Sequence, residues 1–176
     1  GYDEFVLCLG YKGELLKEYF YKYEILNSDF TVTLGQNNKI EKHNNHLETD
    51  WKITLVDTGL NAQKGARLKK IEKFIDTDNF MVTYGDGVAD VDIKKLVEFH
   101  ESHGKIATVT GVRPPSRFGE LLTESNMVKT FSEKPQTSSG HISGGFFVFR
   151  REIFNYLNDG DNCDLEIGIL EELAKK

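Results

Sequence analysis

Short apolar runs alternate with stretches of helical periodicity along most of this chain, and this alternation restricts its fold more than any other feature. Apolar runs bounded by glycine or polar residues are typical of buried strands, whereas apolar residues three or four apart are typical of amphipathic helices. We therefore expect an α/β fold, with a Rossmann-like, mostly parallel but mixed sheet and flanking helices. The expected strands are 5–9, 30–34, 53–56, 80–84 and 106–111, and the expected helices run through 15–20, 65–75 and 92–103.

From Arg113 onward the pattern changes to short strands and turns. We expect hairpin-like pieces there, followed by a long strand over His141–Phe149 and helices over Arg150–Leu157 and from Leu165 onward. The polar stretch Gly35–Asp50, rich in asparagine and histidine, suits an exposed loop or hairpin.

Composition limits the classes of protein to be considered. The chain has 176 residues, of which 39% are hydrophobic, and this length usually makes one domain, so we expect residues 1–176 to form a single one. Its 22 basic and 28 acidic residues give a formal net charge of -6, which disfavours nucleic acid as a partner.

The cysteines and the hydropathy pattern favour a cytoplasmic protein. Cys8 and Cys163 show neither metal-ligand spacing nor a disulfide framework, which fits a reducing compartment. No apolar run approaches the length of about 18 residues that a membrane span needs, so we expect no membrane partner.

The turn Tyr84-Gly85-Asp86-Gly87 closes an expected strand, where ligands of α/β proteins bind. Its glycines allow close approach of a phosphate or sugar, and the Asp86 carboxylate could bind Mg²⁺ through oxygen. The alternative, equally compatible with these four residues alone, is that Asp86 only caps the next helix.

A second strand end, Asp57-Thr58-Gly59, leads to a helix with Arg67 in its first turn. This arrangement could hold a phosphate. The alternative, which the isolated segment favours, is that Arg67, Lys69 and Lys70 form a solvated helix face.

Three further segments are ambiguous when taken alone. Glu133-Lys134-Pro135 is either a surface turn or a pair of groups for a sugar and a phosphate. The glycines of Arg117-Phe118-Gly119 and Ser143-Gly144-Gly145 mark either close ligand approach or a bulge. No Ser or Cys nucleophile motif is present, so direct displacement is more plausible than covalent catalysis.

Taken together, several segments make the chain similar to the glucose-1-phosphate cytidylyltransferase family, and the resemblance spans nearly its whole length. Val-Asp-Thr-Gly followed by Tyr-Gly-Asp-Gly-Val-Ala-Asp is far more specific than either motif alone. The segments are 8–13, 55–59, 67–69, 84–90, 117–119, 131–135 and 143–148.

The resemblance implies a fold of the nucleotide-diphospho-sugar transferase type and a reaction of CTP with α-D-glucose 1-phosphate. The products would be CDP-glucose and pyrophosphate, for the synthesis of dideoxysugars and O-antigen. Family members form homo-oligomers, so the resemblance also implies a homo-oligomer.

The resemblance also implies roles for individual residues. Mg²⁺ on Asp86 would bridge phosphate oxygens, and the catalytic residues would be Lys134, on the attacking phosphate, and Arg67, along the nucleotide. Gly85 would lie against the nucleotide with Asp86. The sugar site would consist of Gly119, Glu133, Lys134 and Gly145.

The chain departs from the family mainly at its ends. The family's glycine-rich triphosphate loop would precede Gly1 and a second metal-binding aspartate would follow Lys176. We therefore expect a partial core, incomplete at both ends, with little turnover of its own. Smaller departures are Gln63-Lys64-Gly65-Ala66, where the family tends to have threonine and paired glycines, and Ser143, where it tends to have asparagine.

Two alternatives remain. One is a non-catalytic remnant that binds a sugar phosphate or a partner. The other is a nucleotide-sugar glycosyltransferase, which the spacing from Asp86 to Asp90 disfavours because such enzymes commonly carry an Asp-x-Asp pair.

Overall fold

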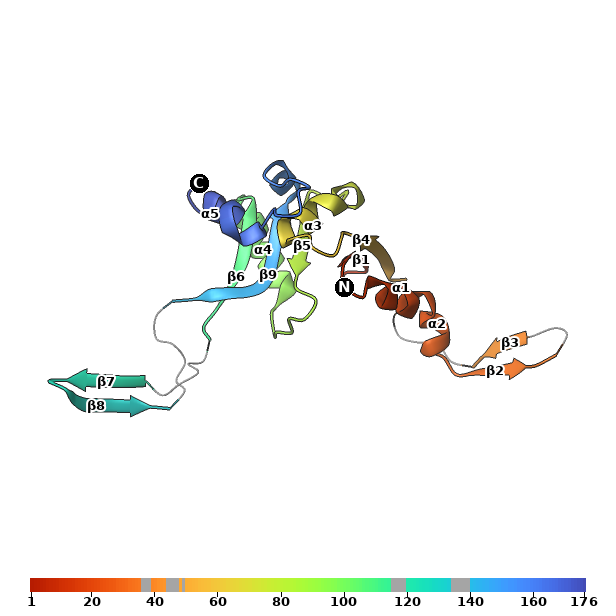
Figure 1. Ribbon diagram of the computed structural model, residues 1–176, viewed down its shortest axis with the longest axis horizontal. Helices are drawn as coiled ribbons and strands as arrows, with labels where there is room; N and C mark the ends of the chain where they lie inside the picture. The colour runs from red at the N-terminus through yellow and green to blue at the C-terminus, as the bar shows by residue number, and fades with distance from the viewer. Residues whose placement is uncertain (36–38, 44–47, 49, 115–119, 134–139) are drawn as a thin grey trace. The chain divides into compact units, whose positions relative to one another are not determined.

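Strands and helices alternate in the computed structural model as the sequence predicts (Figure 1). The structure describes residues 1–176 except 36–38, 44–47, 49, 115–119 and 134–139. It divides the chain into two compact units, Gly1–Asp76 with Phe154–Lys176 and Thr77–Ile153. The expectation of a single partial domain stays a prediction.

The first unit contains a parallel strand pair and the helices that follow each strand. Strand β1 (Glu4–Leu9) pairs in parallel with β4 (Lys52–Asp57), so that Leu9 lies beside Asp57 at the carboxyl ends of both strands. After β1 come α1 (Gly13–Tyr21) and α2 (Tyr23–Leu26), and after β4 comes α3 (Lys64–Ile71).

Helix α3 is shorter than its periodicity predicts. It ends at Ile71 and continues as the tight 3₁₀ turn η1 (Glu72–Phe74), which leaves Phe74 exposed while Leu68 and Ile71 are buried. Its N-terminal half packs on the chain's last segment, because Gly65 has no side chain. A Cβ there would lie 2.8 Å from both the carbonyl oxygen and the sulfur of Cys163.

Residues 39–42 of the polar stretch belong to a hairpin, as expected. Strand β2 (Phe30–Thr33) pairs antiparallel with β3 (Lys39–Lys42), and both strands are exposed.

The last residues of the chain, which belong to the first unit, contain η3 (Leu165–Leu170) and α5 (Glu171–Leu173). The single helix expected from Leu165 is interrupted at Ile167 and at Gly168, which has φ +93°.

The second unit is built on an antiparallel sheet whose central strand is β9 (Ile142–Arg150). Strands β5 (Asn79–Thr83) and β6 (Ala107–Val112) pair with β9 on its two sides. Helix α4 (Ile93–His103) packs on β6 and β9 and directs Ile93, Leu96, Val97 and His100 inward. The hairpin of β7 (Glu120–Glu124) and β8 (Met127–Ser132) confirms the short strands expected after Arg113.

The core of the second unit lies along β9, where Phe147, Val148 and Phe149 are fully buried. Phe147 and Phe149 stack with centroids 5.6 Å apart, and Phe80 from β5 lies 5.9 Å from Phe149. The helix expected over Arg150–Leu157 is instead the end of β9 and the 3₁₀ segment η2 (Arg151–Asn155), because the strand continues through Arg150.

The α/β class is confirmed, with parallel and antiparallel pairing in separate sheets. Within the described residues only β1 and β4 pair in parallel. Strand β9 lies between β5 and β6 and runs antiparallel to both. The described strands therefore contain less parallel pairing than the alternation of strands and helices in the sequence predicts. In the part of the chain that the structure describes, no helix combines the length and apolarity needed to cross a membrane.

Candidate active site

The carboxyl ends of β1 and β4 meet at one edge of the parallel pair, which is where α/β sheets place their ligands. Thr58 follows β4 immediately, and its backbone N–H donates to the carbonyl of Leu9 over 2.9 Å. The loop then turns at Gly59, which has φ +97° and donates its N–H to the Asp57 carboxylate over 3.0 Å. The two strand ends are thereby tied together.

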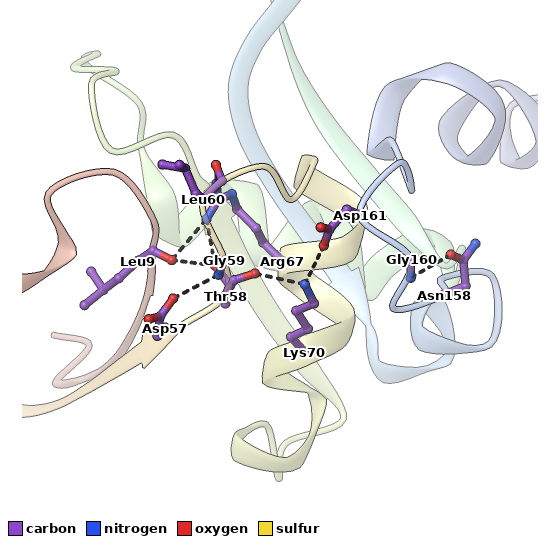
Figure 2. A network of polar contacts seen from close by, with 10 residues as sticks. All are labelled: Leu9, Asp57, Thr58, Gly59, Leu60, Arg67, Lys70, Asn158, Gly160 and Asp161. Atoms are coloured by element: carbon purple, nitrogen blue, oxygen red, sulfur yellow. Dashed lines mark hydrogen bonds and ion pairs between the residues drawn. The ribbon is translucent and has the colours of Figure 1, made fainter.

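Arg67 lies at this edge (Figure 2). Its Nη1 donates to the Leu9 carbonyl over 3.1 Å and to the Thr58 hydroxyl over 2.7 Å, and its Nη2 donates to the Leu60 carbonyl over 3.4 Å. Arg67 is therefore not part of a solvated helix face. The structure directs this cation from α3 onto the ends of both parallel strands.

Lys69 and Lys70, interpreted from the sequence as surface residues, are also engaged. Lys70 donates to the Thr58 carbonyl over 3.0 Å and pairs with Asp161 at 2.8 Å, as Figure 2 shows. Lys69 donates to the Phe154 carbonyl over 3.0 Å and pairs with Glu72 at 2.7 Å. Both lysines fasten the helix to its surroundings.

The two cysteines do not supply a nucleophile. Burial raises the pKa of Cys8 to about 11 against the opposing effect of the Arg67 charge, so its thiol is protonated at neutral pH. Cys163 is buried against Gly65. These observations support the sequence-based preference for direct displacement.

In the second unit, Asp86 lies in an exposed turn that follows β5. The Gly87 N–H donates to the Tyr84 carbonyl over 3.4 Å, and Gly85 has open space where a Cβ would be. The alternative that Asp86 only caps the following helix is wrong, because α4 begins at Ile93 and its cap is Asp92. The Asp92 carboxylate accepts from the Lys95 N–H over 3.1 Å, which lowers the pKa of Asp92.

The Gly144-Gly145 pair forms a bulge in β9. The register with β6 shifts between Val109 and Gly111, and Gly145 has φ +78°. A Cβ on Gly145 would lie 2.8 Å from Cδ2 of Tyr84, the residue that precedes Gly85 and Asp86. The bulge interpretation of this glycine is therefore confirmed, and it places the β9 backbone against the ring that leads into the Asp86 turn.

The remaining predicted site residues lie directly after β8 or outside the described part of the chain. Glu133 directly follows β8 and is exposed. Lys134 and Gly119 lie outside the described residues. Among the residues that are described, no three His, Cys, Asp or Glu side chains gather as a ready-made metal site.

The buried polar cluster in the second unit is structural. His100 is fully buried, and its Nδ1 lies 2.8 Å from the Thr108 hydroxyl, to which His103 Nε2 approaches within 2.7 Å. Burial is the main cause that lowers the pKa of His100.

Sequence reasoning missed Thr58, Gly10, Lys70 and Asp161 as parts of the Arg67 environment. Thr58 stands in the Val-Asp-Thr-Gly motif and could have been found as a polar residue that directly follows a buried strand. Asp161 gave no signal, because 91 positions separate it from Lys70.

Comparison with known proteins supplies the context of this geometry. The family model described as nucleotidyl transferase matches residues 30–173. Glucose-1-phosphate cytidylyltransferases of Salmonella typhi and of Salmonella typhimurium strain LT2 are each 42% identical over 177 aligned positions, which cover 100% of this chain and 68% of each relative. The chain thus spans about two thirds of the length of these relatives.

A solved structure supports the fold alone. HddC from Yersinia pseudotuberculosis superposes with a TM-score of 0.62 at 20% identity, over 98% of this chain and 66% of that protein.

Proposed function

Because the chain belongs to the nucleotidyl transferase family, we propose that it is a glucose-1-phosphate cytidylyltransferase that joins CTP and α-D-glucose 1-phosphate. The observation that carries the proposal is the 42% identity over the entire chain to relatives of that name. A phosphate oxygen of the sugar phosphate attacks the α-phosphorus of CTP, the bond to the β-phosphate breaks, and CDP-glucose and pyrophosphate are released. The product would supply dideoxysugar and O-antigen synthesis.

Arg67 binds the nucleotide in this proposal. Three of its five N–H groups are used by Leu9, Thr58 and Leu60, and its Nε makes no hydrogen bond within the described residues. A fixed guanidinium with N–H groups to spare suits phosphate oxygens, because catalysis of phosphoryl-type transfer depends on positioning and charge neutralisation.

Asp86 holds Mg²⁺ in this proposal, next to Gly85 against the nucleotide. Its side chain is exposed in a turn flanked by glycines, and Mg²⁺ is usually held by only one or two carboxylates together with substrate phosphates and water. A single carboxylate therefore fits the ion. When bound, Mg²⁺ would neutralise phosphate charge.

The sugar phosphate is assigned to residues near β8 and β9. Lys134 binds the attacking phosphate, and Glu133, Gly119 and Gly145 line the glucose. At Gly145 the Tyr84 ring occupies the space that a side chain would need, so the proposal for this residue is that the bulged backbone of β9 contacts the sugar. A homo-oligomer and a cytoplasmic location remain predictions from the sequence.

Isothermal titration tests these assignments. We expect glucose 1-phosphate with Mg²⁺ to bind the chain and Lys134→Ala to abolish that binding, whereas Asp86→Ala weakens binding of CTP with Mg²⁺. Lys129→Ala serves as the control, because this exposed lysine pairs with Glu124 across the β7–β8 hairpin. Absence of binding by both ligands would favour a non-catalytic remnant, and release of a nucleoside diphosphate from a nucleotide sugar would favour a glycosyltransferase.

A further inference from the structure

Thr58 is the central residue of the Arg67 environment. It is only 1% exposed, and each of its polar groups is engaged. Its N–H and its hydroxyl both donate to the Leu9 carbonyl, over 2.9 and 2.8 Å, and its own carbonyl accepts from Lys70 over 3.0 Å. Because the backbone of Thr58 is held on both sides and its hydroxyl donates to Leu9, the hydroxyl oxygen occupies a fixed position.

The direction of these hydrogen bonds determines what the Thr58 oxygen offers to Arg67. The hydroxyl hydrogen is directed to Leu9, which leaves the lone pairs of the oxygen as acceptors. Nη1 of Arg67 donates to this oxygen over 2.7 Å, the shortest hydrogen bond that the guanidinium makes within the described residues. A hydrogen bond from a charged donor is about twice as strong as one between neutral groups.

Gly10 provides the space that this arrangement needs. A Cβ at residue 10 would lie 2.8 Å from both Nη1 and Nη2 of Arg67 and 3.1 Å from the Gly59 carbonyl. Any side chain would therefore displace the guanidinium from the strand ends. Gly10 directly follows β1 and Thr58 directly follows β4. The residues after both parallel strands therefore hold the Arg67 guanidinium, Gly10 by leaving space for it and Thr58 by its hydroxyl.

We propose that Thr58 is a positioning residue for the cytidylyl transfer, which orients the Arg67 guanidinium toward the nucleotide phosphates through its hydroxyl, while Gly10 leaves the room that this orientation requires. The inference rests on the proposed function for the identity of the nucleotide. Thr58 has no hydrogen left for a phosphate, because its one hydroxyl hydrogen is used by Leu9, so it acts through Arg67.

A double-mutant cycle tests this inference in the full-length protein. We expect Thr58→Val to lower kcat/KM for CTP by about 10- to 100-fold, the size of one hydrogen bond to a charged group, with the KM for glucose 1-phosphate changing less than about twofold. Thr58→Ser keeps the hydroxyl and should restore kcat/KM to within about threefold of the wild type. In an Arg67→Ala background, Thr58→Val should add less than about a twofold loss.

Gly10→Ala is the second variant. Its methyl group meets the end of the Arg67 side chain and, at 3.1 Å, the Gly59 carbonyl, so activity should fall about 10-fold or more. Thr108→Val is the matched control: this threonine is also buried and hydrogen-bonded, but to two histidines of the other unit. It should lose stability like Thr58→Val and keep wild-type kcat/KM.

The modification rate of Arg67 by phenylglyoxal, followed by mass spectrometry, reports its position without any turnover. Thr58→Val and Gly10→Ala should raise this rate at least about threefold over wild type and over Thr108→Val, since a released guanidinium is more accessible. If the wild type releases no pyrophosphate, the proposed function fails, and the modification rate still decides whether Thr58 holds the guanidinium. Equal modification rates, or an undiminished effect of Thr58→Val in the Arg67→Ala background, would overturn the inference.

Discussion

Replacing Gly145 with alanine should destabilise the protein strongly, for two separate reasons. Gly145 has φ +78°, and the left-handed region costs a residue with a Cβ about 1–2 kcal/mol. The new methyl group would also lie 2.8 Å from Cδ2 and 3.1 Å from Cε2 of Tyr84. That ring packs edge-on against buried Phe147 at 5.9 Å, which limits its movement.

Overpacking of this kind costs about 1–3 kcal/mol, so the two effects together predict a loss of about 2–5 kcal/mol in the free energy of unfolding. For a chain of this size the midpoint of thermal unfolding should fall by about 2–4 °C for each kcal/mol.

Urea unfolding followed by circular dichroism measures this loss through the unfolding midpoint and slope. Gly87→Ala is the matched control in the same unit, because a Cβ there meets only the Tyr84 carbonyl, at 3.8 Å, and its φ is not left-handed. A Gly145→Ala variant within about 0.5 kcal/mol of Gly87→Ala would refute the reasoning. The bulge would then tolerate a side chain, and the close approach to Tyr84 would not be a constraint.

Three further predictions concern titratable groups. The pKa of His100 is lowered below its ordinary 6.5, chiefly by burial and then by the charges of His103 and Arg150, so the unfolded chain binds a proton at this residue more readily than the folded protein does. The free energy of unfolding should therefore fall as the pH drops below 6.5. His100→Gln should flatten this dependence in urea unfolding midpoints measured across that pH range. The Asp164 carboxylate accepts hydrogen bonds from the N–H groups of Ile167 and Glu166, at 2.7 and 2.8 Å, and these bonds lower the pKa of Asp164 below 3.8. Asp164→Ala should lower the free energy of unfolding in urea by about 1 kcal/mol at neutral pH. This difference from the wild type should vanish as the pH falls below 3.8 and the carboxylate is protonated. The pKa of Cys8, raised to about 11 by burial, predicts slow reaction of its thiol with iodoacetamide at pH 8 and fast reaction in urea; fast labelling of the folded protein would contradict this.

Much of the fold could be predicted because apolar periodicity is local information. The runs at 5–9, 53–56 and 80–84 lie within one residue of β1, β4 and β5. The sequence could not predict which strands pair with one another or in which direction. The position of β9 between β5 and β6 depends on pairs of residues that lie 30 to 71 positions apart, from Val112–Ile142 to Asn79–Arg150, and no local pattern specifies the direction of pairing.

The candidate site was predictable where a residue's role depends on its place at a strand end. The structure removes the solvated-face interpretation of Arg67 and the helix-cap interpretation of Asp86, and the roles of both residues stay predictions. The surroundings of Arg67 were not predictable, because they depend on the space that Gly10 leaves and on the orientation of a single buried hydroxyl. Helix ends were the weakest predictions. Phe74 and Ile167 fit a helical pattern, yet Phe74 lies in a 3₁₀ turn and Ile167 has non-helical backbone angles.

The most direct test of the central claim is ³¹P NMR of the full-length protein with CTP, glucose 1-phosphate and Mg²⁺. The account predicts that the signals of both substrates decline together while those of CDP-glucose and pyrophosphate grow in equal amounts, and that Arg67→Ala slows this conversion. Unchanged substrate signals, or hydrolysis of CTP without formation of CDP-glucose, would contradict it.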